Sequence, residues 1–268
     1  DLESISNLMF FSTDGILGTP ISVSSTYIFV FLLFGAFLVK TGVGQYFNDL
    51  AVALAGKLTG GPAKVAIFSS ALQGTISGSS VANVVTSGSY TIPMMKKLGY
   101  KKEFAGAVEA AASTGGQLMP PIMGAAAFLM VEFIGRGITY WEIAKAAAIP
   151  ALLYFTGIWI MTHFEAKRLG LRGLSDEEMP NRKEVLKKIY LLIPILLIIV
   201  LMLTGTPVMK AALYGVLACI LVGMFNKDTR LGPIDMIDAL VDGARTALGV
   251  VAATACAGII VGVVVKTG

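Results

Sequence analysis

The stretch that decides the fold is PAKVAIFSSALQGTISGSSVANVVTSGSYTIPMMKKLGY, which runs from Pro62 to Tyr100. Two arms flank a polar centre of glycine, serine and threonine at residues 74–80. The arm from Lys64 to Ile76 would rise about 20 Å as an α-helix, which is less than the membrane hydrocarbon thickness of about 30 Å. The pattern predicts two half-length helices that meet at a polar tip inside the membrane. Non-helical backbone is tolerated there only where it is buried in protein or lines a wet cavity.

The composition around this stretch is that of a membrane protein. Of 268 residues, 55% are hydrophobic and only 14% are charged, and the mean hydropathy is +0.77. Soluble domains carry about 25% charged residues. The cations behind the net charge of +4 fall between apolar runs and form no basic face with interleaved aromatic residues, which argues against nucleic-acid binding. We therefore predict an all-α polytopic membrane protein.

A second interruption follows the hairpin. The stretch from Glu103 to Ile134 is long enough to cross a membrane, but Gly115-Gly116-Gln117-Leu118-Met119-Pro120-Pro121 divides it. Two prolines remove two amide donors and clash with the preceding helical turn. We predict a span broken into half-helices of roughly a dozen residues, about 18 Å each. Interrupted helices point to the binding site of a transporter, and the alternative is a helix that is merely kinked.

The order of apolar and charged runs divides the chain into five predicted segments. Residues 1–61 are expected to be scaffold and begin with an interfacial helix. A first span follows at Tyr27–Val39, extended by residues 22–26 and Lys40. An amphipathic arm follows at Val43–Leu58, with a stripe of Phe47, Leu50 and Leu54. Residues 62–100 form the re-entrant hairpin. Residues 101–164 hold the broken helix and a span at Thr139–His163, and are expected to be the transport domain. Residues 165–188 form a cytoplasmic loop. Residues 189–268 begin a second, truncated inverted repeat with spans at Ile189–Leu203 and Val208–Phe225, an arm at Asn226–Arg245 and a span at Thr246–Val265.

The distribution of cations predicts which loops face the same side. Residues 165–188 contain seven of the 21 lysines and arginines, and short basic loops stay in the cytoplasm. Counting spans back places Gly135–Gly137 outside and the cluster at Lys96–Lys102 inside. If residues 62–100 crossed the membrane completely, Lys40, Lys57 and Lys64 would instead lie outside. The motif Val39-Lys40-Thr41-Gly42 recurs as Val265-Lys266-Thr267-Gly268, on the opposite side by this count, as an inverted repeat requires.

The residues that carry chemistry lie at the two interruptions. The hairpin offers Ser77, Gly78, Ser79, Ser80 and Asn83, and the break offers Ser113, Thr114, Gln117, and unpaired carbonyls near Gly115 and Gly116. Hydroxyl and carbonyl oxygens suit a hard monovalent cation such as Na⁺, whereas a transition metal would require His or Cys and Mg²⁺ or Ca²⁺ would require carboxylates. The helix N-termini at Ser80 and after Pro121 are expected to face an anionic substrate.

Two acidic residues lie inside the broken span. Glu132 is four residues before Arg136 and is expected to form an exposed helix pair. Glu109 lies about two turns from the inner end; we favour a structural role and leave an ion or proton role open. The single histidine, His163, ends an apolar span and is expected to be interfacial, so no Ser-His-Asp arrangement is predicted. We expect neither an enzyme nor a cofactor.

The two quoted motifs, continued by EFAGAVEAAASTGGQLMPPIMGAAAFLM, resemble the large membrane subunit of tripartite ATP-independent periplasmic (TRAP) transporters. The resemblance covers residues 20–268 and is nearest to the branch in which small and large membrane subunits are fused. It implies uptake of organic acids across a bacterial or archaeal inner membrane, driven by a Na⁺ gradient. It also implies a periplasmic substrate-binding protein, a small membrane subunit or its fused equivalent, and an elevator mechanism.

By position, the resemblance implies a Na⁺ site at Ser77, Gly78, Ser79, Ser80, Gly115 and Gly116, and substrate contacts at Ser79, Ser80, Asn83, Gln117, Pro120 and Pro121. The small-subunit region and a second hairpin have no counterpart in these residues, so the chain is expected to hold about half of the binding site. Two alternatives stay open: a dicarboxylate or citrate carrier that needs no binding protein, and a membrane scaffold subunit that does not transport.

Overall fold

The computed structural model describes residues 2–134, 137–225 and 230–267, and these ranges contain helices and turns but no β-strand. The prediction of an all-α chain is confirmed. The α-helices are α1 (Leu2–Ser6), α2 (Thr19–Val23), α3 (Phe29–Lys40), α4 (Val43–Ala55), α5 (Gly61–Ser77), α6 (Ser80–Leu98), α7 (Lys102–Gly115), α8 (Ala125–Ile134), α9 (Tyr140–Arg168), α10 (Arg182–Lys187), α11 (Ile193–Leu203), α12 (Val208–Phe225) and α13 (Pro233–Thr267). Short π-helical segments at Asn7–Phe11 and Ser24–Ile28 and 3₁₀ turns at Asp176–Glu178 and Ile189–Leu192 join them.

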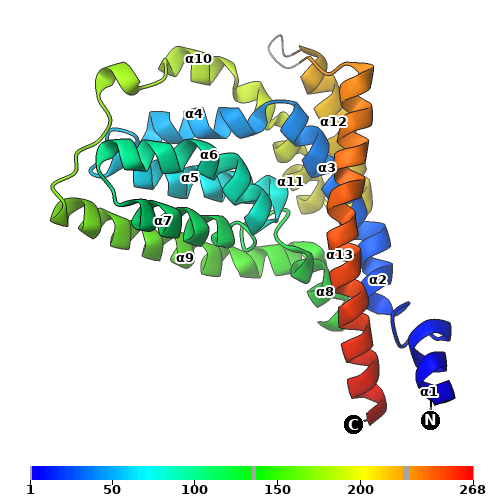
Figure 1. Cartoon of the computed structure of the whole chain (residues 1–268). Helices are drawn as coiled ribbons and strands as arrows, with labels where there is room; N and C mark the ends of the chain where they lie inside the picture. The colour runs from blue at the N-terminus through cyan, green and yellow to red at the C-terminus, as the bar shows by residue number, and fades with distance from the viewer. Residues whose placement is uncertain (1, 135–136, 226–229, 268) are drawn as a thin grey trace.

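The helices form two groups that run in different directions (Figure 1). Helices α3, α11, α12 and α13 pack as one bundle, which α2 extends. Helices α4, α5, α6, α7 and α9 lie side by side and cross that bundle. One hydrophobic core lies mainly in and beside the bundle, and a smaller one lies between α5, α6, α7 and α9. The hairpin therefore belongs to the second group, with its tip directed at the first.

Within the described ranges, four helical stretches are long and apolar enough to cross a membrane: Thr19–Lys40, Tyr140–Arg168, Val208–Phe225 and Pro233–Thr267. They coincide with four predicted spans, and the chain is a multi-pass membrane protein. The predicted span at Ile189–Leu203 is shorter than expected, because a 3₁₀ turn precedes only 11 α-helical residues. This stretch is bent by 68° against the segment Asp176–Lys187.

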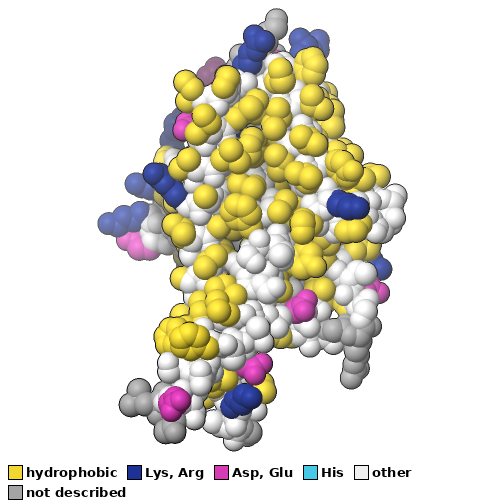
Figure 2. All heavy atoms as spheres, turned by 90° about the vertical axis from the view of Figure 1, so that its right-hand side faces the viewer, with side chains coloured by type: hydrophobic (Ala, Val, Ile, Leu, Met, Phe, Trp, Pro, Cys, Tyr) yellow, Lys and Arg dark blue, Asp and Glu magenta, His cyan; other side chains and the backbone are white. Residues whose placement is uncertain are grey.

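The outer surface of the bundle is apolar, as a lipid-facing surface must be. Figure 2 shows this face, where hydrophobic side chains dominate the centre and most charged side chains lie toward the margins. On α13, Leu248, Ile260 and Val265 are each more than 60% exposed. Large contiguous apolar areas of this kind mark membrane or protein contact.

Helix α13 corrects one sequence prediction. The expected arm at Asn226–Arg245 and span at Thr246–Val265 form a single helix of 35 residues from Pro233 onward, while residues 226–229 lie outside the described part of the chain. Gly243 in its interior acts as a contact point and not as a break, because a methyl group there would lie 2.7 Å from Leu33. Small residues let membrane helices approach closely.

The packing of α13 against the first span is antiparallel. Lys40 at the end of α3 pairs with Asp242 (3.4 Å), and Lys266 at the other end of α13 pairs with Asp14 (3.6 Å). The two lysines belong to the two copies of the Val-Lys-Thr-Gly motif. Opposed directions agree with an inverted repeat, which stays a prediction.

Helix α4 is amphipathic as predicted, but its buried face differs from the expected stripe. Phe47 is buried, whereas Leu54 is 60% exposed. The buried side consists of Val43, Tyr46, Phe47, Asn48, Ala51, Val52 and Ala55. Alanine and asparagine occupy this face because α5 packs closely against it, and Asn48 accepts hydrogen bonds from Ser69 and Gln73 of α5.

The cationic end of α6 and the 165–188 segment meet at one end of the molecule. Lys97 pairs with Glu178 at 2.7 Å, and Leu174 N donates to the carbonyl of Gly56 at 2.8 Å. The hydrogen bond from Lys97 holds the pKa of the Glu178 carboxyl below its ordinary value. The lysines at the end of α6 and the basic segment 165–188, which the sequence predicts on the same side of the membrane, are therefore adjacent. The assignment of these two clusters to the cytoplasm stays a prediction. Gly135 and Arg136, which were predicted to lie outside, fall outside the described residues, and so does the partner that was predicted for Glu132.

Candidate functional site

The hairpin has a two-residue tip. Helix α5 ends at Ser77 and α6 begins at Ser80, so the polypeptide reverses at Gly78 and Ser79. Gly78 has φ of 56°, a left-handed conformation that glycine adopts without steric cost. The Ser79 hydroxyl accepts a hydrogen bond from Ala82 N at 3.3 Å and caps α6. The predicted pair of helices is confirmed, while the depth of the tip in the membrane stays a prediction.

The break in the following span is also confirmed, and it is longer than predicted. Helix α7 ends at Gly115 and α8 begins at Ala125, four residues after Pro121. The carbonyls of Gly115 and Gly116 accept hydrogen bonds from Leu118 N (3.0 Å) and Met119 N (3.3 Å). Unpaired carbonyls were expected near Gly115 and Gly116, but the carbonyls of these two glycines are themselves used, because the loop folds into turns.

A tyrosine from α9 holds the second half of the break. The Tyr140 hydroxyl donates to the carbonyl of Pro121 at 2.9 Å and also contacts that of Ile122. Its ring stacks on Phe128 with centroids 4.4 Å apart. A residue of the first turn of α9 thus anchors the loop.

The hairpin tip and the break touch one another through glycines. A methyl group on Gly74 would lie 2.4 Å from the Cα of Gly116, and one on Gly78 would lie 1.9 Å from the carbonyl oxygen of Met123. Such separations leave room for hydrogen only, so the two backbones are in direct contact. A side-chain hydrogen bond from Gln117 Nε2 to Ser80 Oγ, at 3.0 Å, adds a polar link.

Four helix ends converge at this contact. The C-termini of α5 and α7 carry partial negative charge, and the N-termini of α6 and α8 carry partial positive charge. A cation is favoured beside the first pair of ends, and an anion beside the second pair. The arrangement therefore offers a place for a cation and a place for an anion within one small region, as the two interruptions in the sequence predicted.

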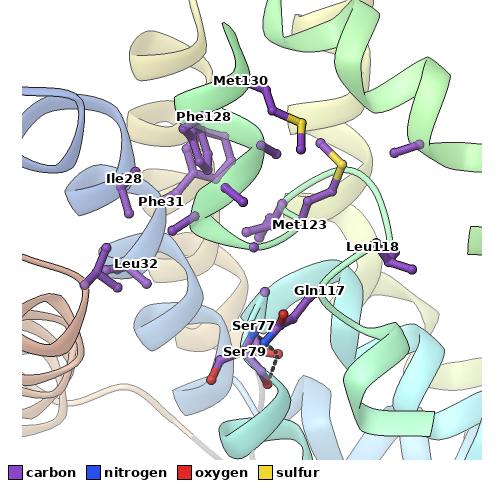
Figure 3. Close-up of a pocket in the computed structure, with 18 of the residues that line it drawn as sticks. Ile28, Phe31, Leu32, Ser77, Ser79, Gln117, Leu118, Met123, Phe128 and Met130 are labelled. Carbon is purple, nitrogen blue, oxygen red and sulfur yellow. Dashed lines mark hydrogen bonds between the residues drawn. The ribbon is translucent and has the colours of Figure 1, made fainter. Parts of the chain in front are cut away.

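A cavity of about 580 Å³ adjoins the contact. Ser77, Ser79 and Gln117 lie together on one wall, and apolar side chains that include Phe31, Phe128 and Met130 lie on another (Figure 3). Helices α3 and α13 close a further side with Leu32, Thr246 and Gly249. Ligand pockets typically combine a mostly apolar lining with a few polar groups.

The predicted site residues divide into two sets. Ser77, Gly78, Ser79 and Gln117 line the cavity, and Ser80 lies next to it through its bond to Gln117. The others lie behind this wall: Asn83, Gly115, Gly116 and Pro121 are buried and Pro120 is half-buried. Asn83 donates to the carbonyl of Ser70 at 2.8 Å, so in this conformation its amide group joins the two hairpin arms.

Sequence reasoning missed the wall that α3 and α13 supply. Phe31 and Thr246 are separated from the hairpin along the chain and carry no local motif. A hydroxyl in an otherwise apolar span is a weak signal for Thr246, and Phe31 offers none. Among the described residues, no group of three or more His, Cys, Asp or Glu side chains is arranged to hold a metal ion.

Residues 4–268 match the family described as "Tripartite ATP-independent periplasmic transporter, DctM component". The C4-dicarboxylate TRAP transporter large permease protein of Vibrio cholerae is 29% identical over 209 residues, which are 76% of this chain and 44% of that protein. The sialic acid TRAP transporter large permease protein of the same organism is 29% identical over 63% of this chain and 39% of its own length.

An isethionate TRAP transporter permease protein of Oleidesulfovibrio alaskensis is 29% identical over 53% of this chain and 22% of its own length. The chain thus spans less than half the length of these curated relatives. The relatives are named as transporter permeases. With the family match extending over nearly every residue, the chain belongs to the DctM component family of tripartite ATP-independent periplasmic transporters.

Proposed function

We propose that this chain is part of a Na⁺-coupled permease that imports organic acids with the help of a periplasmic binding protein. The observation that carries the proposal is the contact between the hairpin tip and the broken span at the wall of a cavity. Binding sites of secondary transporters are formed by discontinuous helices at such positions.

Na⁺ is the proposed coupling ion because the polar groups at the tip are oxygen donors. Ser77 and Ser79 carry hydroxyls beside the C-terminus of α5, where partial negative charge accumulates. A hard monovalent cation prefers such oxygens. Gly115 and Gly116 would contribute through the second lone pair of their carbonyls, since the first accepts a turn hydrogen bond.

An organic acid is the proposed substrate because the N-termini of α6 and α8 supply positive partial charge near the same cavity. Ser79, Ser80 and Gln117 would bind polar groups of this substrate, and Asn83, Pro120 and Pro121 would support the wall from behind. Relatives are named for C4-dicarboxylate, sialic acid and isethionate, which fits a family that carries small organic anions.

The proposed mechanism is an elevator, in which the group of α5 to α9 moves against the bundle of α3, α12 and α13. The cavity lies between these two groups, with the hairpin and the break on one side and α3 and α13 on the other. The proposed partners are a periplasmic binding protein and a small membrane subunit or its fused equivalent, and the proposed location is a bacterial or archaeal inner membrane.

Uptake by the full-length parent protein, reconstituted in vesicles, tests the proposal. We expect uptake of an organic acid only when the binding protein encoded beside it and an inward Na⁺ gradient are both present. Uptake without the binding protein would instead support a dicarboxylate or citrate type of carrier. Absence of uptake for every organic acid tried, with an active binding protein present, would support a scaffold subunit.

A further inference from the structure

A smaller cavity of about 180 Å³ adjoins the main cavity at the hairpin tip. Ser77 and Ser79, which lie together at the tip (Figure 3), line both cavities, and so does Thr246 of α13. The end of α5 rests against α3 here, because a methyl group on Gly35 would lie 2.9 Å from the carbonyl oxygen of Ile76. The small cavity therefore continues the proposed binding cavity along the bundle.

An ion pair lines this small cavity. Lys40 Nζ, at the end of α3, lies 3.4 Å from Asp242 Oδ2 on α13, and both residues line the cavity opposite the tip serines. Among the described residues that line the two cavities, Lys40 and Asp242 carry the only charges. An organic anion that moves from the tip into the small cavity therefore meets one full positive charge, which is the ammonium group of Lys40.

The ion pair can exchange its partners at low cost. The side chain of Lys40 is 30% exposed and that of Asp242 is 54% exposed, and ion pairs as accessible as this one contribute little to stability. The ammonium group is carried on a flexible four-carbon chain. Arg245 follows Asp242 by three residues on α13, a spacing at which helical side chains interact. Lys40 can therefore turn from Asp242 to an anion in the cavity without leaving a buried, unpaired charge behind.

We propose that Lys40 binds the anionic group of the transported organic acid, in place of the Asp242 carboxylate with which it pairs in this structure. The inference rests on the proposed function and deepens it, because it names a charged residue of the bundle that contacts the substrate. Ser77 and Ser79 belong to the group that moves in the proposed elevator, whereas Lys40 does not. Lys40 therefore reaches the substrate only while the hairpin tip lies beside α3.

Equilibrium binding of a labelled organic acid to the purified full-length parent protein, measured in Na⁺ buffer, tests the proposal. The probe is whichever of succinate, sialic acid and isethionate the wild type takes up in vesicles. Lys40→Met should raise the Kd of this probe about tenfold, whereas Lys40→Arg keeps the charge and should retain most of the affinity. Asp242→Asn removes the competing carboxylate and should lower the Kd by up to about fivefold.

A double variant separates binding of the substrate from a purely structural role of the ion pair. If Lys40 acts only through Asp242, Lys40→Met should have no further effect in an Asp242→Asn background. We expect it to raise the Kd about tenfold in that background too. Lys97→Met is the matched control, because it breaks an ion pair with Glu178 (2.7 Å) that lines neither of the two cavities, and it should leave the Kd unchanged.

The proposal is overturned if Lys40→Met leaves the Kd unchanged in the Asp242→Asn background. If Lys40→Met does not fold, Asp242→Asn decides alone, because an unchanged or higher Kd in this variant shows that Lys40 does not receive the anion that Asp242 displaces. Uptake by the wild type with an unchanged Kd in the variants overturns this inference and leaves the proposed function standing. Absence of both uptake and binding in the wild type, for all three probes, overturns the proposed function and this inference together.

Discussion

Replacing Gly78 by alanine tests the contact between the hairpin tip and the break. The residue is in the left-handed region with φ of 56°, and a methyl group on it would lie 1.9 Å from the carbonyl oxygen of Met123. The neighbouring atom is backbone, so no side-chain rotation relieves the overlap. Either Gly78 changes its conformation or the Met123–Gly124 turn moves away.

The expected cost follows from these two effects. A non-glycine residue in the left-handed region costs about 1–2 kcal/mol. Overpacking of a close contact costs about 1–3 kcal/mol. Gly78→Ala should therefore destabilise the protein by about 2–5 kcal/mol. Gly106→Ala is the matched control on α7, because a methyl group there meets nothing within 4 Å and alanine is favoured in a helix interior by about 1 kcal/mol.

Equilibrium unfolding of the full-length parent protein in detergent measures both variants. Hydrogen exchange of residues 119–124 provides a second readout, because loss of the contact should expose this loop even where the helices stay folded. The tip does not rest on the break if Gly78→Ala has the same free energy of unfolding as the wild type and if the amides of residues 119–124 exchange equally slowly in both proteins. A loss of stability in Gly106→Ala of the same size would show that the assay reports any added methyl group.

Three further predictions concern the surroundings of the site. Tyr140→Phe leaves the buried carbonyl of Pro121 without its donor, and should cost about 1–3 kcal/mol in unfolding experiments and increase hydrogen exchange in the loop. Ser79→Ala combined with Gln117→Ala should weaken the Na⁺ dependence of uptake, measured as initial rate against Na⁺ concentration. The hydrogen bond from Lys97 lowers the pKa of Glu178, so this ion pair is intact at neutral pH and is lost only as the pH falls below the ordinary range of a glutamate carboxyl; Glu178→Gln should imitate this loss and speed proteolytic cleavage within residues 171–178.

Each of these has a matched control. Tyr214→Phe alters a tyrosine on α12 that is 49% exposed, and it should be neutral. Ser89→Ala removes an exposed hydroxyl from α6 and should leave the Na⁺ response unchanged. Glu177→Gln, next to Glu178 in sequence, should not alter cleavage. An effect of equal size in a control would show that the assigned contact is not the cause.

The two interruptions were predictable because their residues break helices by themselves. Gly78 permits the left-handed turn, and Pro120 and Pro121 remove amide donors. The same local reasoning failed for the last segment, which it divided into an arm and a span. The charged arm before Thr246 and the span after it form one helix, because nothing between Pro233 and Thr267 prevents continuation.

Long-range contacts account for most of what the sequence did not predict. Packing against α5 decides which face of α4 is buried, and the largest apolar side chains of α4 do not. Leu54 is therefore exposed. The hydroxyls that donate to the buried Glu109 carboxylate come from three helices and are up to 43 residues apart in sequence, from Ser70 to Ser113. The buried face of α4 and the hydroxyls around Glu109 have no local pattern in the sequence. The carbonyls of Gly115 and Gly116 differ from these, because the hydrogen bonds that they accept come from amides only three residues further along the chain.

Titration calorimetry of Na⁺ into the purified full-length parent protein tests the central claim most directly, because it needs no partner and no substrate. Wild type should bind Na⁺ saturably, and K⁺ at the same ionic strength should not compete. The double variant Ser79→Ala, Gln117→Ala should lose most of this binding while Ser89→Ala retains it. Unchanged binding of Na⁺ in the double variant would contradict a cation site at the contact between hairpin tip and break.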